Sequence, residues 1–233
     1  MTRWIDDGVK AVFFDAVGTI LFPDPPVSRI YGRIAQEFGG DVPDPDQLRQ
    51  QFRASFKLEE ERDRLAEWRT SEDWEVTRWR RIVGSCMKNV SDAEGAFQAL
   101  FQHFATSEAW KLHPETDAVL SELERRGLVI GMGSNYDARL QSVVAGHEPL
   151  KKLQHVVISS LVGWRKPGRG FFDAVREATG LPAESILFVG DDVQNDYEGA
   201  KAVGMRVVLL DPLDSHPEVS ERIRTLSELV VSE

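Results

Sequence analysis

Cysteine is nearly absent from this chain, which carries a single one, Cys86, among 233 residues. One cysteine can form no disulfide within the chain and cannot build a thiolate cluster for a metal. Folds that depend on disulfides belong to oxidising compartments, so this composition is typical of a reducing one. We therefore expect a cytoplasmic protein that is held together by an apolar core.

Long apolar runs and an excess of positive charge are also missing. No stretch approaches the roughly 20 apolar residues of a membrane span, and the polar residues 1–7 do not resemble a signal peptide. Lys and Arg number 28 against 38 Asp and Glu, which gives a formal net charge of -10. This charge argues against nucleic acids and anionic membranes as partners. No apolar surface stripe calls for a partner chain, so the oligomeric state stays open.

Hydrophobic residues make up 42% of the chain, enough for one large domain with a smaller insertion. From His113 onward strand and helix patterns alternate, which predicts a parallel sheet covered on both faces. The strands are predicted at 9–14, 128–134, 155–159, 186–189 and 206–210. The helices are predicted at 115–126, at 138–145, from Pro167 to about Gly180, and through Gly199.

From about Pro23 to Trp110 the pattern is helical, with no convincing strand. Apolar residues recur at helical spacing in three stretches, namely Leu48, Phe52 and Phe56; Trp79, Ile82, Val83, Cys86 and Met87; and Phe97, Leu100, Phe101 and Phe104. Ser91 and Glu94 have the spacing of a capping box. We expect four packed helices, with the tryptophans in their core. The simplest architecture is an α/β core, residues 1–22 and 113–233, with an all-helical cap inserted at 23–112.

Chemically active side chains follow four of the predicted strands, where each strand ends. Strand by strand they are Asp15 and Thr19; Ser134 and Asn135; Lys166; and Asp191, Asp192 and Asp196. Any one of them could be a helix cap or a turn residue. The carboxyl ends of parallel strands meet at one edge of the sheet, where such folds bind ligands. The order and placement of these residues therefore favour a functional site.

The chemistry of this set is coherent. Several carboxylates at one edge repel each other and favour a bound cation, and Asp15 and Asp191 offer the hard oxygen ligands that suit Mg²⁺. Lys166 supplies a fixed positive charge, and the hydroxyls of Thr19 and Ser134 can bind phosphoryl oxygens. Such groups together would neutralise the charge on a phosphoryl group that a carboxylate attacks.

The whole chain resembles the haloacid dehalogenase-like hydrolases with a helical cap after the first strand. The resemblance rests on Asp15-Ala16-Val17-Gly18-Thr19, Ser134-Asn135, Lys166-Pro167 and Gly190-Asp191-Asp192 through Asp196. It implies a Rossmann-like doubly wound core, Mg²⁺, and Asp15 as a nucleophile that forms an aspartyl intermediate. By the same resemblance, Lys166 would be catalytic, and Thr19, Ser134 and Asn135 would bind substrate. Asp15, the Val17 carbonyl and Asp191 would hold the metal, while Asp192 and Asp196 would lie behind them.

Val17 departs from the pattern of the family's phosphatases, which carry a second aspartate there. That aspartate protonates the leaving oxygen and then activates water, and general acid–base help of this kind is worth roughly 10²–10⁴ in rate. Valine can do neither. Three consequences are open: substrates with good leaving groups such as acyl phosphates, a proton donor from the cap, or slow turnover.

Three other functions tolerate an apolar residue at position 17. Haloacid dehalogenases release a halide that needs no proton, but they use no metal, and the retained Asp191, Asp192 and Asp196 argue against this reaction. A binding or scaffold protein with weak catalysis is the second. Phosphonoacetaldehyde hydrolases instead compensate with a cap lysine, for which Lys57 is the candidate here, although its charged neighbours favour an exposed position.

Three arginines remain open. Arg49 and Arg53 could reach an anionic substrate from the cap or lie exposed, and Arg165 could add positive potential beside Lys166 or face solvent. The sequence as a whole predicts a Mg²⁺-dependent hydrolase that acts on a small phosphorylated metabolite.

Overall fold

The computed structural model describes residues 2–87 and 89–231 of the chain. Within them the central sheet has six parallel strands in the order β5-β4-β1-β6-β7-β8. Their bounds are β1 Ala11–Phe14, β4 Val129–Ser134, β5 His155–Ile158, β6 Ile186–Gly190, β7 Arg206–Leu210 and β8 Arg222–Ile223. The predicted doubly wound α/β fold is confirmed. Strand β8 was missed because two residues are too short to show a pattern.

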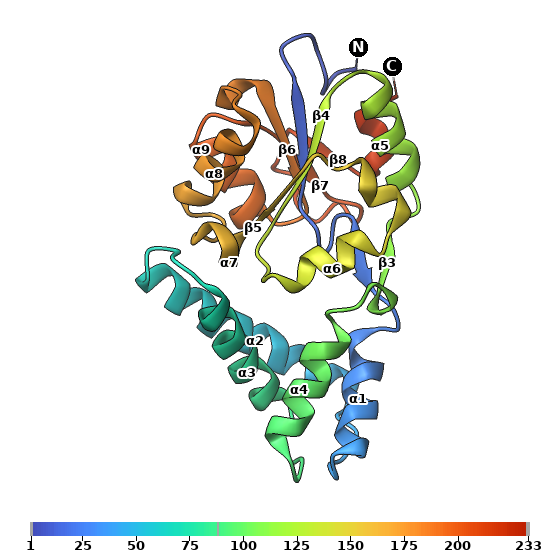
Figure 1. Cartoon of the computed structure of the whole chain (residues 1–233), viewed down its shortest axis with the longest axis vertical. Coiled ribbons are helices and arrows are strands. Elements are labelled where there is room, and N and C mark those ends of the chain that lie inside the picture. The colour runs from blue at the N-terminus through green and yellow to red at the C-terminus, as the bar shows by residue number, and fades with distance from the viewer. Residues whose placement is uncertain (1, 88, 232–233) are drawn as a thin grey trace.

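Helices cover both faces of the sheet, and alternating side chains of the strands contact them. Phe13 and Phe14 of β1 belong to separate apolar cores on opposite faces. One face is covered by α5 and α6, and the other by α8 and α9 (Figure 1). The bounds are α5 Thr116–Arg125, α6 Arg139–Ala145, α7 Ser159–Val162, α8 Arg169–Thr179 and α9 Gly199–Ala202, with a π-helical turn at Val193–Glu198 before α9.

Four helices, called here the helical unit, lie beyond the end of the sheet that is opposite to the chain termini (Figure 1). They are α1 Val27–Glu37, α2 Pro45–Leu65, α3 Glu72–Cys86 and α4 Ala93–His103. Each contributes apolar side chains to a separate core that includes Ile34, Leu48, Val83 and Leu100. The prediction of four helices is confirmed. None of the helices within the described ranges is both long and apolar enough to cross a bilayer.

A short antiparallel ribbon connects the helical unit to the sheet. It pairs β2, Leu21–Pro23, with β3, Trp110–Leu112. These two strands flank the stretch from Pro23 to Trp110 that is predicted to be helical, and the sequence does not predict them because each has only three residues. The predicted boundaries of core and cap fall at this ribbon, and the division into two domains stays a prediction.

The predicted capping box is wrong by one residue. The N-cap of α4 is Asp92, whose side chain accepts a hydrogen bond of 2.9 Å from the backbone N–H of Gly95. Ser91 instead donates to the Gly39 carbonyl, and Glu94 pairs with Arg80. Aspartate and serine cap helices about equally well, so spacing alone could not choose between neighbours.

A buried ion cluster joins the helical unit to the loop before α8. Arg165 is only 5% exposed, and its guanidinium lies 3.2 Å from the Asp63 carboxylate of α2 and also pairs with Glu75 of α3. Arg78 of α3 pairs with Asp63 as well, at 3.2 Å. The sequence left two roles open for Arg165, and the structure supports neither, because its side chain faces away from solvent and is bound to the helical unit.

Replacing Arg165 by Met would leave Asp63 and Glu75 buried with Arg78 as the remaining cation of the cluster. We expect the free energy of unfolding in urea to fall by about 3–5 kcal/mol, because an uncompensated charge stays buried. The control is Arg33→Gln, which removes an exposed pair with Glu37 and should change it by less than about 1 kcal/mol. Equal losses in the two variants would contradict a structural role of the cluster.

Candidate active site

The ends of β1, β4 and β6 lie side by side because these three strands are neighbours in the sheet. Asp15 directly follows β1 and extends its pairing, since its backbone N–H donates to the Val189 carbonyl at 2.8 Å. Gly18 has φ +101°, and a Cβ there would lie 2.4 Å from a carboxylate oxygen of Asp191. Only glycine lets this loop approach Asp191 so closely.

Lys166 is at the centre of the site. Its Nζ donates to Asp15 Oδ1 at 2.5 Å, to Asp196 Oδ1 at 2.6 Å and to the Gly133 carbonyl at 3.0 Å. The three donors of the ammonium group are therefore all used, inside a site where Lys166 is 2% exposed. This geometry fixes both the lysine and the carboxylate of Asp15.

Asn135 positions the backbone of Lys166. Its Nδ2 donates to the Lys166 carbonyl at 2.9 Å, and its Oδ1 accepts from the Lys166 N–H at 2.7 Å. Because the amide is engaged at both ends, its direct contribution is to hold the lysine. Binding of substrate by Asn135 stays a prediction.

Three carboxylates surround this lysine, and they are a candidate magnesium site. Asp15, Asp191 and Asp196 each offer an oxygen that lies within 4.8 Å of the others. Asp196 is engaged by Lys166 and by the Asp192 N–H, which leaves Asp15 and Asp191 as the freer ligands. Hard oxygen donors at this spacing fit Mg²⁺. A contribution from the Val17 carbonyl stays a prediction.

The charges of the site are not balanced by the protein. Burial, with repulsion from Asp15, raises the pKa of Asp196 to about 7 against the attraction of Lys166. Partial desolvation, with repulsion from Asp196, raises the pKa of Asp191 to about 6, although this side chain lies at the solvent-exposed mouth of the site. Burial also raises the pKa of Asp15. Burial would lower the pKa of Lys166, but the carboxylates of Asp15 and Asp196 outweigh it and raise that pKa. The unbalanced negative charge therefore favours the binding of a cation at this site.

The structure brings the two predicted hydroxyls to the same edge. Thr19 is fully buried and donates to Asp191 Oδ1 at 3.0 Å. Ser134 ends β4 and is buried, and in the described part of the chain its hydroxyl makes no hydrogen bond. Ser134 is thus the more available of the two for a ligand oxygen.

Two further candidates lie at the margins. Asp192 is exposed and caps the turn that carries Asp196, because its Oδ1 accepts from the N–H groups of Gln194 and Asn195 at 2.9 and 2.7 Å. Lys57 is exposed and lines a separate surface cleft, as its charged neighbours indicated. Neither residue contacts the lysine.

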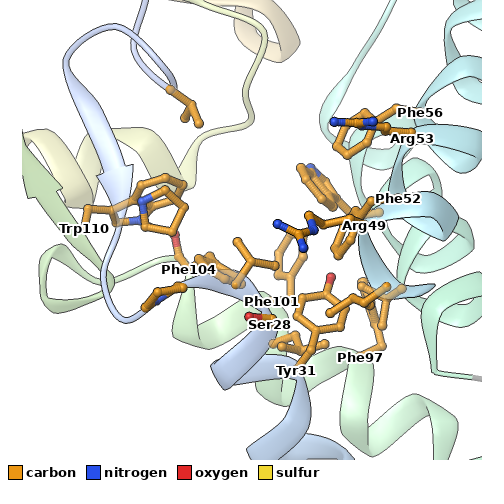
Figure 2. A pocket seen from close by; sticks show the side chains of 18 of the residues that line it. Ser28, Tyr31, Arg49, Phe52, Arg53, Phe56, Phe97, Phe101, Phe104 and Trp110 are labelled. Carbon is orange, nitrogen blue, oxygen red and sulfur yellow. The ribbon is translucent and has the colours of Figure 1, made fainter. Parts of the chain in front are cut away.

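A cavity of about 650 Å³ lies between the helical unit and the active-site loops. Val17 and Asn135 belong to its wall, and most of the remaining wall is aromatic and aliphatic (Figure 2). The sequence predicts the tryptophans in the helical core, and Trp79 does pack against that core, whereas Trp110 belongs to a core of the sheet. Both also line this cavity. Aromatic residues at helical spacing give the same pattern in both cases, so the sequence carried no signal for the cavity.

Comparisons with known proteins agree with this geometry. The family described as haloacid dehalogenase-like hydrolase matches residues 9–204. The chain is 29% identical to haloacid dehalogenase-like hydrolase domain-containing protein 3 of Bos taurus, over 92% of this chain and 87% of that one. It is 32% identical to a phosphoserine phosphatase of Thermus thermophilus, over 56% of this chain and 54% of that one. A crystal structure of a dehalogenase has the same fold, with a TM-score of 0.72 at 17% identity, over 98% of this chain and all of that one.

The raised pKa of Asp196 predicts a pH-dependent loss of stability without metal. A carboxyl with a higher pKa in the folded than in the unfolded chain stabilises the fold at low pH, and this is lost as pH rises from about 4 to about 7. In EDTA, the difference in unfolding free energy between Asp196→Asn and wild type should therefore shift in favour of the variant by roughly 2–3 kcal/mol as pH rises from about 5 to about 7.5. Asp44→Asn, at an exposed helix cap, is the control. A difference between Asp196→Asn and wild type that does not vary with pH would contradict the assignment.

Proposed function

The chain belongs to the haloacid dehalogenase-like hydrolases, and on that basis we propose that it is a Mg²⁺-dependent phosphohydrolase with Asp15 as its nucleophile. The observation that carries the proposal is the pair of contacts from Lys166 Nζ to Asp15 and Asp196, beside the carboxylate of Asp191. The match to a phosphoserine phosphatase supports the same reaction class. The physiological substrate of this chain is a separate question.

In the proposed reaction, Asp15 attacks phosphorus with one carboxylate oxygen while Lys166 holds the other, Oδ1. The new bond joins Asp15 to phosphorus, and the bond from phosphorus to the leaving oxygen breaks, with both electrons going to that oxygen. Water then attacks the phosphorus of the aspartyl phosphate, which releases phosphate and restores Asp15. The Ser134 hydroxyl donates to a phosphoryl oxygen, and bound Mg²⁺ would supply neutralising charge.

Val17 limits this reaction. Its side chain is 38% exposed and lines the cavity next to the site, where a phosphatase of this family carries its proton donor. No described side chain of the cavity wall is a carboxylic acid. We therefore infer that turnover favours leaving groups that are stable as anions.

Substitutions at positions 15 and 17 test the mechanism. Asp15→Asn should abolish phosphate release, because an amide is a poor nucleophile. Val17→Asp should raise the rate on alkyl phosphates by about 10- to 10³-fold, because it restores the proton donor. The measurement is phosphate release from a substrate panel with Mg²⁺.

Val17→Asn is the matched control, since it has nearly the same shape as aspartate and cannot transfer the proton. An equal gain in Val17→Asp and Val17→Asn would show that polarity rather than proton transfer is responsible. No phosphate release by wild type from any substrate of the panel would refute the proposed function.

A ligand-binding measurement tests the metal site without turnover. BeF₃⁻ mimics a phosphoryl group on a carboxylate, so Mg²⁺ with BeF₃⁻ should raise the melting temperature of wild type by several degrees. Asp15→Asn should show no such increase. A rise of equal size in that variant would place the binding away from Asp15.

A further inference from the structure

The cavity in Figure 2 is the place where the leaving group of a substrate on Asp15 would lie. Its volume of about 650 Å³ is within the range of roughly 300–1,000 Å³ that is usual for ligand pockets. Val17 stands two residues after Asp15 and Asn135 follows Ser134, and both form part of the wall, whereas Asp15 itself is buried and does not line the cavity. A group that is attached to phosphorus on Asp15 would reach the cavity past Val17, in the direction of the helical unit.

Aromatic rings surround this space from several helices. Phe52 and Phe56 project from α2, Tyr31 from α1, and Phe101 from α4, as Figure 2 shows. Tyr31 and Phe52 contact each other edge to face with their ring centroids 5.0 Å apart, and Phe52 stacks on Phe56 at 6.0 Å. These contacts build a preformed wall that is complementary to an aromatic ring.

Several polar groups of the wall are engaged by the protein itself, whereas the hydroxyls of Ser28 and Tyr31 and the indole N–H of Trp79 make no hydrogen bond within the described part of the chain. The Asn135 amide holds Lys166, and the Tyr136 hydroxyl donates to the Phe104 carbonyl at 3.0 Å. Arg139 makes two bonds of 2.7 Å to the Asp137 carboxylate. A sugar or polyol would lose hydrogen bonds to water and regain few here, which disfavours such substrates.

The two arginines of α2 in the cavity wall differ from each other in this respect. Arg49 pairs with Asp46, whereas Arg53 has no ion-pair partner among the described residues. Arg53 lies beside Phe56 at the cavity wall (Figure 2). It adds positive charge to the cavity wall.

The aromatic wall and the absence of a proton donor at Val17 favour the same class of compound. We propose that the substrate is a phosphate ester or anhydride of an aromatic body, with a phenolic or carboxylic leaving oxygen. The inference rests on the proposed phosphohydrolase function and names its substrate class. The aromatic wall selects the body, and Val17 selects a leaving oxygen that departs without a proton.

Two acyl phosphates separate the ring from the leaving group. Acetyl phosphate and benzoyl phosphate both release a carboxylate, and they differ chiefly in the aromatic ring. We expect kcat/KM for benzoyl phosphate to exceed that for acetyl phosphate by about 10- to 100-fold, from burial of the ring. Spontaneous hydrolysis is subtracted with Asp15→Asn. Equal values for the two substrates would overturn the substrate class and leave the phosphohydrolase function standing.

Variants of the wall test which residues set this preference. Phe56 is exposed enough, at 38%, for Phe56→Ser to fold, and this variant should reduce the benzoyl preference at least several-fold. Leu58→Ser, on the same helix and away from the cavity, is the matched control and should keep the preference. Ser28→Trp should fill the cavity and reduce turnover of benzoyl phosphate more than that of acetyl phosphate. A preference that none of the cavity variants changes would overturn the assignment.

Binding of phosphonates, which are not hydrolysed, to wild type separates the cavity from the chemistry. With Mg²⁺ present, benzylphosphonate should raise the melting temperature more than methylphosphonate does. No phosphate release by wild type, together with this stronger aryl shift, would refute the phosphohydrolase function and keep the binding preference of the cavity. Equal shifts from the two phosphonates would overturn the preference.

Discussion

The ammonium group of Lys166 is the interaction on which the rest of the site depends. It bonds to Asp15 and Asp196, which come from separate segments of the chain, and to the end of β4 through Gly133. One positive charge cannot neutralise three carboxylates, so the site keeps an excess of negative charge. The ammonium group that holds Asp15 in place therefore leaves negative charge that a divalent cation can neutralise. Lys166 therefore both fixes the position of Asp15 and determines the net charge of the site.

The α/β core could be predicted well from the sequence because buried parallel strands are continuous apolar runs. The predicted strands 128–134 and 206–210 correspond to β4 Val129–Ser134 and β7 Arg206–Leu210. The approach of Asp15 and Asp191 could be predicted for the same reason, since both directly follow strands that end at one edge of the sheet. Lys166 comes after β5 and α7, so periodicity alone does not place it.

Other features could not be predicted, because they depend on contacts that leave no periodic signal. Arg165 and Glu75 are 90 positions apart, and neither their spacing nor their neighbours indicate that they pair. Strands β2 and β3 are too short for a period to be measured. The cavity was hidden because its aromatic wall has the spacing of an ordinary helical core. In each case the information is in the three-dimensional approach of distant segments.

Because Arg165 and Lys166 are consecutive, a change in the helical unit can affect the position of the catalytic lysine. Arg165 is bound to acidic side chains of α2 and α3, and Lys166 is bound to Asp15 after β1 and to Asp196 in the turn before α9. A single peptide bond thus links the ion cluster of the helical unit to the ion pairs of the active site. A substitution in α2 or α3 that displaces Arg165 would therefore also displace Lys166, the side chain that holds the nucleophile.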